Sequence, residues 1–435
     1  MNGKFRKYLL IITLGLAGGS IYFLPYIKYV FYDAHIACMN ITNTQSGYLM
    51  TMYTIGNVIL YLPGGILADR ISPRKALSWS CLGTSAFVFL YLFTMKNFVI
   101  SMIIWMGLAF STGFVVWAAL LKTVRIIGTE EEQGFLYGLY YACNGIAAAA
   151  VNAAAVLVYN TGADMESGFF RACVFGGIVP IIVAVLLMVL LREEDGKAGA
   201  DGGEPKFRMA DVGKLLKNPV VWVISAIMFC GYGFYMSTSY FNPYLTEVVG
   251  ISMVDSGLLS AVRTYLLLLL APVGGLIADK CFKSTSKWLC TSFTLTAVLF
   301  GIVLVLPKGM NAGLASFYTL IPGAVVMMTY GVISSVVAEV GIPKSMTGTV
   351  IGIISIIGYL PDAVYSVLFG AWLDRYQGEG YPLIFGFLAA TGLLAAAMAF
   401  YVFRYGMKRN TQITSKAAKS AAGTISREIV NELGK

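Results

Sequence analysis

Apolar stretches of about 20 residues recur along almost the whole sequence, and they constrain the fold more than any other feature. A helix of about that length crosses the roughly 30 Å of hydrocarbon in a bilayer. Of the 435 residues, 58% are hydrophobic and 12% are charged, whereas a soluble domain carries about 25% charged residues. The pattern predicts an all-α, polytopic membrane protein, and so many runs cannot be one signal peptide.

Twelve membrane-spanning helices are predicted. Their approximate limits are 8–32, 46–68, 75–95, 98–121, 134–158, 169–191, 219–245, 254–278, 286–306, 312–337, 346–370 and 382–404. The polar, glycine-rich interval 192–218 is predicted to be a cytoplasmic linker. It separates an N-terminal six-helix bundle (1–191) from a C-terminal six-helix bundle (219–405), and a cytoplasmic tail occupies 406–435.

The positions of the basic residues predict the orientation. With both termini in the cytoplasm, all Lys and Arg residues fall on the cytoplasmic side except Lys28, Lys96, Arg171, Arg263, Lys308 and Arg375. Cytoplasmic loops of membrane proteins carry such an excess of Lys and Arg. We therefore expect a multi-pass protein of the plasma membrane, which in a bacterium is the inner membrane. This topology explains the net charge of +9 without a nucleic-acid partner.

The sequence offers little for catalysis or metal binding. Its seven cysteines are scattered singly, and His35 is its one histidine. No CxxC pair, HExxH motif or Walker motif is evident, so we predict no metal, no cofactor and no ATP-driven step. The sequence favours a protein that is not an enzyme.

An internal repeat relates the two halves. The octapeptide that starts at Pro63 (PGGILADR) returns in altered form at Val273 (VGGLIADK). Glycines around Gly134 and Gly348 repeat at a similar offset. Two parallel repeats of six helices form the architecture in which a solute site lies near the midplane between the halves.

The first copy of this repeat belongs to a longer loop motif, G-x-L-a-D-r-x-x-x-R-K, at Gly64–Lys75, with a degenerate copy at Gly274–Lys283. With twelve spans and a central linker, the motif resembles that of the major facilitator superfamily. The resemblance implies a gating role, separate from the solute site, for Gly65, Asp69, Arg70, Arg74, Gly275, Asp279 and Lys280. Arg125 and Glu339, at equivalent positions in the two halves, are either a gate pair or solvated loop charges.

Two segments are more loosely similar to the organophosphate:phosphate antiporter branch of that superfamily. They are PYIKYVFY (Pro25–Tyr32) and EEEQGFLYGLYYACNG (Glu130–Gly145). The second phosphate-binding arginine of that branch would fall near Gly231, a departure that counts against a phosphate ester.

Arg263 is the first candidate for binding an anion. It lies about nine residues inside its predicted span, where an ionisable group is costly and usually faces a cavity or a partner. Its guanidinium fork suits a carboxylate, and the oxalate/formate exchangers of the superfamily are similar in placing a basic residue on span 8. Asp362, beside Pro361 at a matching depth, is the expected counter-charge. It is a partner that substrate displaces, a carboxyl that titrates during proton symport, or a permanent structural pair.

Further candidates lie on spans 1, 5, 7 and 11. Lys28 points away from the aromatic stripe of its helix and reaches a cavity only if Pro25 kinks the span. It is otherwise an interface anchor. The remaining candidates are polar or aromatic residues at helical spacing, which serve either solute binding or helix packing: Tyr22, Tyr26, Asn144, Tyr232, Tyr235 and Tyr359.

The sequence therefore predicts a monomeric secondary transporter that moves a small anionic organic solute, such as a carboxylate or a sugar acid. We expect rocking-bundle alternating access, with proton symport and anion exchange both open as coupling modes. Two alternatives remain. One is a transporter-like membrane sensor that binds without flux, and the other is a carrier of a neutral sugar or nucleoside.

Overall fold

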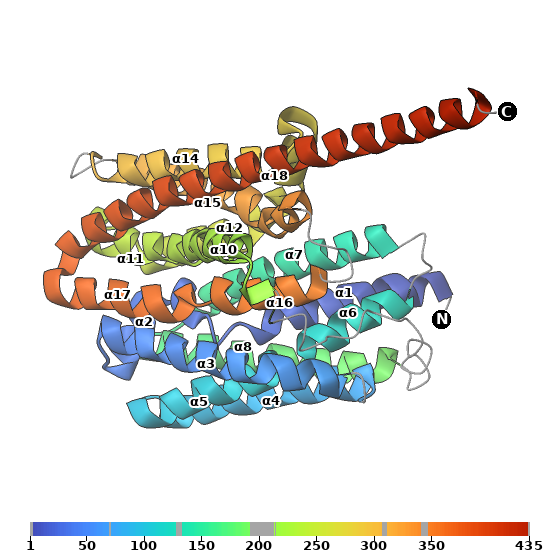
Figure 1. Cartoon of the computed structure of the whole chain (residues 1–435). Helices are drawn as coiled ribbons and strands as arrows, with labels where there is room; N and C mark the ends of the chain where they lie inside the picture. Colours follow the sequence, from blue (N-terminus) through green and yellow to red (C-terminus); the bar gives the residue numbers. More distant parts are fainter. Residues whose placement is uncertain are drawn as a thin grey trace.

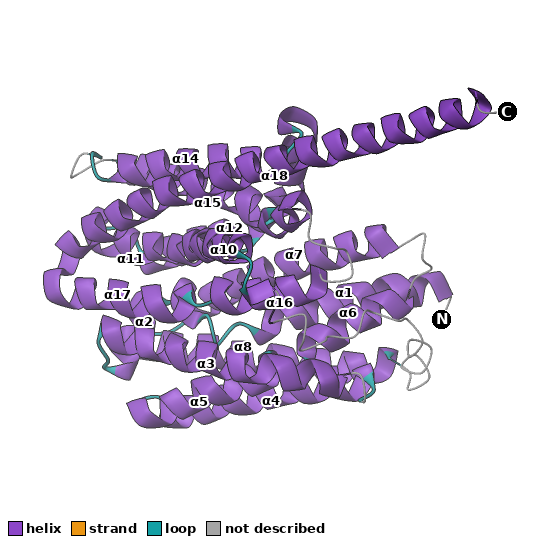
Figure 2. Cartoon of the chain, in the orientation of Figure 1, coloured by secondary structure: helices purple, strands orange, loops and turns teal. Residues whose placement is uncertain are grey.

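The computed structural model describes residues 3–68, 71–127, 133–191, 213, 215–306, 311–340 and 347–433. Every regular element in these ranges is a helix (Figure 2). Eight helical stretches are long and apolar enough to cross a membrane. The last of them, Ile353–Lys408, joins two of the predicted spans in one stretch. The twelve predicted segments all reappear as helical rods, although several rods are broken into shorter pieces.

The first six predicted segments correspond to α1 to α8. Segment 1 is interrupted, and the short α2 follows it; segment 4 is also interrupted, and the others are continuous. The elements are α1 (Gly3–Ile21), η1 (Ile27–Tyr29), α2 (Tyr32–Met39), α3 (Asn43–Ala68), α4 (Pro73–Thr94), α5 (Phe98–Thr112), α6 (Val116–Ile127), α7 (Gln133–Tyr159) and α8 (Met165–Leu190).

The last six segments contain more interruptions. Segments 7, 8, 10 and 11 are each built from two or more helical pieces, with short 3₁₀ or π elements between or after the α-helices. The elements are α10 (Pro219–Ser237), η4 (Thr238–Tyr240), α11 (Phe241–Tyr244), η5 (Leu245–Val249), α12 (Met253–Thr264), η6 (Leu266–Leu270), α13 (Ala271–Leu276), η7 (Ile277–Phe282), α14 (Thr285–Val303), α15 (Ala312–Tyr330), η8 (Ile333–Val340), α16 (Thr347–Gly358), α17 (Pro361–Tyr376), η10 (Gln377–Glu379) and α18 (Gly380–Leu433).

Proline and glycine account for the two breaks nearest the centre of the molecule. Pro25 has no N–H to donate, and the chain between Ile21 and Ile27 forms turns instead of helix. α16 ends at Gly358, and α17 begins afresh at Pro361, a favoured first residue of a helix. The first break leaves backbone carbonyls inside the bundle that need partners from other helices.

The helices pack mainly within each half, and two seams join the halves. In the first half α1 packs against α7, and α4 packs against α8; in the second, α14 packs against α18. The seams between the halves pair α3 with α17, and α7 with α12. α2, α11 and the end of α17 lie at the end of the molecule opposite the two chain termini (Figure 1).

α18 is longer than its predicted span. The sequence places the end of the last span near residue 404, yet the helix continues to Leu433 and projects beyond the bundle (Figure 1). The predicted domain limits at 191 and 219 stay a prediction, because 192–212 lie outside the described residues.

Glycines permit the closest helix contacts in both halves. A Cβ at Gly15 would lie 2.5 Å from the Cβ of Cys143 on α7, and one at Gly19 would lie 2.6 Å from the backbone nitrogen of Ala148. α1 therefore approaches α7 backbone to backbone, as small residues allow in membrane helix pairs. Gly274 does the same for α13 against α15, because its Cβ would lie 2.0 Å from the Met328 carbonyl oxygen.

Replacing Gly15 with Ala should lower the melting temperature of the detergent-purified protein. The added methyl collides with backbone and Cβ atoms that cannot rotate away, which costs about 1–3 kcal/mol. The matched control is Gly138→Ala on α7, where a Cβ meets nothing within 4 Å. Equal melting temperatures for the two variants would contradict the close packing of α1 on α7.

Candidate substrate site between the two halves

The break in the first span places unpaired backbone groups between the two halves. The carbonyl of Pro25 accepts a hydrogen bond from Trp105 Nε1 at 3.3 Å. Asn242 Nδ2 donates to the carbonyls of Tyr29 (3.3 Å) and Val30 (2.8 Å), and the hydroxyl of Ser260 also donates to the Tyr29 carbonyl. The carbonyls of Tyr29 and Val30 are therefore satisfied by α11 and α12 of the second half.

Asp362 is the polar centre of this region. The side chain is buried, and it accepts hydrogen bonds from three tyrosine hydroxyls. Tyr29 donates to Oδ1 at 3.0 Å, and Tyr26 and Tyr232 donate to Oδ2 at 3.2 and 2.5 Å. Two of these tyrosines come from the first half and one from the second. A buried carboxylate needs such partners, so the site connects both halves through one acceptor.

Lys28 reaches the same region through the break that Pro25 produces. Its side chain is 3% exposed, and Nζ donates to Ser366 Oγ at 2.7 Å and lies 5.7 Å from the centroid of the Tyr240 ring. Ser366 is one helical turn after Asp362 on α17, so the ammonium and the carboxylate interact through space. The condition set by the sequence, a kink at Pro25, is met.

Arg263 is fully buried, but it does not pair with Asp362 as the sequence analysis expected. Its Nε donates to the Thr238 carbonyl and its Nη1 to Thr319 Oγ1, both at 3.0 Å. Its guanidinium carbon lies 5.4 Å from the centroid of the Phe241 ring. Matching depth along two helices says nothing about the direction of the side chains. Here Arg263 points toward η4 and α15, whereas Asp362 points toward the first span.

Two features keep Arg263 a candidate for binding an anion. Its Nη2 is buried and has no hydrogen-bond partner in the described part of the chain. It also lies one turn after Ser260 on α12, and Ser260 donates to the backbone of η1, which carries Tyr29 and Lys28. Arg263 and Asp362 therefore flank the broken first span from two different helices.

Tyrosine rings line the region around Asp362. The rings of Tyr232 and Tyr359 meet edge to face at 4.7 Å, and those of Tyr235 and Tyr330 stack at 4.9 Å. In the first half Tyr22 lies 6.0 Å from Tyr26, and Tyr26 lies 5.6 Å from Tyr53.

Sequence reasoning missed four residues of the region: Tyr53, Tyr240, Thr319 and Tyr330. Tyr53, Thr319 and Tyr330 lie on spans 2 and 10, where no charged residue at membrane depth draws attention to a face. Asn144, in contrast, donates to Tyr140 on its own helix (3.5 Å) and lies against Gly18. It therefore belongs to the contact between α1 and α7.

The structure covers the gating motifs only in part. Gly65 lies on α3, whereas Asp69 and Arg70 are outside the described residues, as is the side chain of Arg125. Arg74 on α4 and Gly275 on α13 are half-buried, and Asp279 and Lys280 on η7 are exposed.

Glu339 is held within the second half. It accepts hydrogen bonds from the backbone N–H groups of Thr285 and Ser286 and from the hydroxyls of Ser284 and Ser286. It therefore caps the first turn of α14, where backbone N–H groups have no helical partner. The cross-half pair of Glu339 with Arg125 stays a prediction.

Asp374 closes the seam between α3 and α17 at the end away from the chain termini. Its carboxylate accepts from Asn43 N and Nδ2 and from Thr44 N, each at 2.8 Å, and from Thr44 Oγ1 at 2.5 Å. The second half thus caps the N-terminus of a helix of the first half. Beneath this cap the helices touch closely, because a Cβ at Gly47 would lie 2.6 Å from the Ser366 carbonyl oxygen.

The structure is therefore closed at this end. The hydrogen bonds recorded between the halves run from the Asp374 cap to the Asp362 site, and they include Asn242 to Val30 and Thr246 Oγ1 to Asp33 Oδ2 (2.6 Å).

Replacing Asp374 with Ala should open the seam. Without the carboxylate, four donors at the start of α3 lose their acceptor, and Thr51, half-buried below the cap, becomes accessible. In a cysteine-free variant carrying Thr51→Cys, a membrane-impermeant maleimide added from that side should react several-fold faster. Asp255→Ala is the control, because Asp255 lies at the same end but bonds only Ser252 of its own half. An unchanged maleimide reaction rate in Asp374→Ala would show that the Asp374 cap does not hold the seam closed.

Comparison with known proteins places this fold. A family model described as the Major Facilitator Superfamily matches residues 9–366, and the chain therefore belongs to the major facilitator superfamily. Among solved structures, the chain is similar to a bacterial homolog of the human lysosomal transporter Spinster, with a TM-score of 0.72 and 15% sequence identity over 92% of this chain and 96% of that one. It is also similar to the nucleoside transporter NupG, with a TM-score of 0.69 and 12% identity over 93% of this chain and 100% of that one.

Several bacterial proteins are similar to the chain in sequence. The chain is 27% identical over 421 residues to the inner membrane protein YihN of Escherichia coli, with 95% of this chain and 99% of the relative covered. It is also 29% identical over 216 residues to the probable nitrate/nitrite transporter NarK2 of Mycobacterium tuberculosis, which covers 49% of this chain and 51% of that protein. The chain is thus a membrane protein whose relatives include transporters of small molecules.

Proposed function

We propose that the protein is a secondary transporter of a small organic anion, with one net negative charge, and that the solute binds around the broken first span. The observation that carries this proposal is the charge of the buried site. The fully buried Lys, Arg, Asp and Glu side chains of the described residues are Lys28, Arg263 and Asp362. If all three are ionised, they sum to one positive charge, which an anion would neutralise.

The arrangement also suits the exchange of partners that alternating access requires. Asp362 is bonded to tyrosines of both halves, and Lys28 of the first half is bonded to Ser366 of the second. A solute that takes over these donors and acceptors would uncouple the halves at this end. The probable nitrate/nitrite transporters among the relatives handle small anions, which supports the charge of the solute.

The remaining parts of the proposal concern topology and coupling. We place the chain in the bacterial inner membrane, as a monomer with both termini in the cytoplasm, where two six-helix bundles rock about the site. On this orientation the closed end is the outer one. Asp362 serves either as a proton carrier in symport or as a fixed charge in anion exchange, and uptake by counterflow at clamped pH separates the two modes. No chemical step is assigned to the chain, so we propose that it is not an enzyme.

Arg263→Gln should abolish anion binding. In a thermal-shift screen of the purified protein against lactate, gluconate and nitrate, with glucose and uridine as neutral probes, the wild type should be stabilised by at least one anion. Loss of the buried charge should weaken the binding of that anion about 30-fold or more, because a desolvated charge partner contributes ~2 kcal/mol or above to the binding free energy. Arg263→Lys, which keeps the charge, is the control.

Three outcomes would overturn the proposal. Normal anion binding by Arg263→Gln would remove the role of Arg263, and stabilisation by glucose or uridine alone would favour a carrier of neutral solutes. Binding without uptake in reconstituted vesicles would favour a membrane sensor.

The charge of the site makes a second prediction through a double variant. Lys28→Met should lose anion binding, because the site then has no net charge and Asp362 lacks its cation. Lys28→Met combined with Asp362→Asn again leaves one positive charge, on Arg263, and should recover much of the affinity in the same thermal-shift measurement. Tyr365→Phe, whose ring packs against Phe229 and Phe387 and which alters no charge, is the control. Failure of the double variant to bind better than Lys28→Met would mean that Lys28 contacts the solute directly.

A further inference from the structure

A second polar site lies between the halves, nearer the closed end than Asp362. There a small hollow is lined by residues of α2, α7, α11 and α12 and of the segment before α2. Asp33, Tyr159, Asn242 and Met253 are among the lining residues. Asp33 is the one carboxyl group in this lining.

Asp33 is bonded on one side only. Its Oδ2 accepts from Thr246 Oγ1 at 2.6 Å, which links α2 of the first half to η5 of the second. Its Oδ1 is buried and has no hydrogen-bond partner among the described residues. A buried carboxylate oxygen without a partner is costly when the group is ionised, and a proton on that oxygen removes the charge.

The groups around Asp33 do not supply a compensating cation. Four titratable groups interact with it through space, and all of them are acids: Tyr32 on its own helix, Tyr159 on α7, Glu247 on η5 and Tyr381 on α18. Tyr381 donates to Glu247 Oε2 at 2.8 Å, so its hydroxyl is already engaged.

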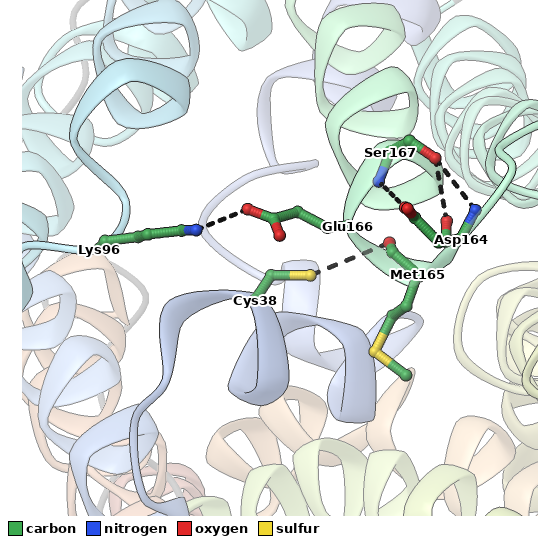
Figure 3. A network of polar contacts seen from close by, with 6 residues as sticks. All are labelled: Cys38, Lys96, Asp164, Met165, Glu166 and Ser167. Atoms are coloured by element: carbon green, nitrogen blue, oxygen red, sulfur yellow. Dashed lines mark hydrogen bonds and ion pairs between the residues drawn. The ribbon is translucent and has the colours of Figure 1, made fainter.

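The charged groups on the other elements packed against α2 have partners elsewhere. On α8, Glu166 pairs with Lys96 at 2.7 Å, as Figure 3 shows, and Arg171 donates to the Thr161 carbonyl. On η1, Lys28 donates to Ser366. On α11, Tyr244 lies against the Tyr381 ring.

We propose that Asp33 is a proton-binding site of the gate at this end, and that protonation of Asp33 holds the gate closed. In the closed state the carboxyl lies between the halves with Oδ1 unpaired. When the halves part, the same carboxyl meets water and ionises as an ordinary aspartate. This inference concerns the gate and does not depend on which solute is carried.

The direction of the pH dependence follows from linkage. Burial raises the pKa of the Asp33 carboxyl in the closed state, and the hydrogen bond from Thr246 offsets part of that rise. The carboxyl has a raised pKa in the closed state and its ordinary pKa in the open state. Protonation therefore stabilises the closed state fully at pH values below the ordinary pKa. This stabilisation is lost as the pH rises through the raised pKa of the closed state. The closed state should therefore be fully favoured below about pH 4, the ordinary pKa of an aspartate, and should weaken as the pH rises through the raised pKa of Asp33.

Electron–electron distance measurements on the full chain in lipid nanodiscs test this proposal. Spin labels on Ala163→Cys, in the loop between α7 and α8, and on Gly378→Cys, in η10, report the separation of the halves in a cysteine-free background. The short-distance population should grow as the pH is lowered from about 7 toward 4. In Asp33→Asn, which mimics the protonated form, that population should be high and independent of pH.

Two further variants sharpen the test. Thr246→Val removes a hydrogen bond that favours the ionised carboxyl, so the midpoint of the transition should move up by about one pH unit. Asp164→Asn is the matched control: Asp164 is an exposed N-cap of α8 on the same side, where it accepts from Ser167 N (Figure 3), and Asn caps equally well. Its pH response should equal that of the wild type.

The results that would overturn the proposal are equally definite. A wild type whose distances do not change with pH would refute it, as would an unaltered pH response in Asp33→Asn. If Asp33→Asn fails to fold, an unshifted midpoint in Thr246→Val contradicts the proposal. Because the readout is the separation of the halves, these results are independent of the anion-binding screen.

Discussion

The break in the first span, between Ile21 and Ile27, is the feature on which the rest of the site depends. A helix that continued through Pro25 would satisfy its own carbonyls and would direct Lys28 away from the aromatic face. The break instead leaves the carbonyls of Tyr29 and Val30 to α11 and α12, and it brings Lys28 to Ser366. In a bundle interior without bulk water, those partners must come from protein. One local irregularity therefore ties the first half to the second.

The same need for hydrogen-bond partners within the protein applies to the polar side chains between the halves, which gather in two places, around Asp362 and around Asp33. Around Asp362, three tyrosine hydroxyls from the two halves donate hydrogen bonds to one carboxylate. Around Asp33, nearer the closed end, one oxygen is satisfied and the other is not. The Asp374 cap lies at the seam of α3 and α17. A transporter must break such contacts in every cycle, and hydrogen bonds to side chains at helix ends can be broken without disturbing the packing inside either half.

Much of the fold could be predicted because bilayer thickness leaves few choices. The apolar runs predicted the twelve rods, with limits near those observed except at the end of α18, and Gly15 and Gly18 indicated a close helix contact that the structure places at α1 and α7. The site was predicted less well. Four predicted residues do come together, namely Lys28, Asp362, Tyr26 and Tyr232, but Arg263 does not meet Asp362. No sequence feature marked Tyr53 or Tyr330 as part of the site. Depth along a span can be read from a sequence, whereas the direction of a side chain depends on the rotation of one helix against its neighbours.

The sequence by itself determined the class of molecule: a polytopic helical membrane protein with an internal repeat and a few ionisable residues buried among apolar ones. Those properties depend on hydropathy, on residue counts and on local spacing, which need no tertiary information. Only the tertiary structure decided which ionisable residues share a site, that Glu339 caps α14, and that Asp33 and Asp374 join the halves at one end. The reason is geometric, because these contacts link residues up to 338 positions apart in the sequence, and their formation depends on how the broken helices pack.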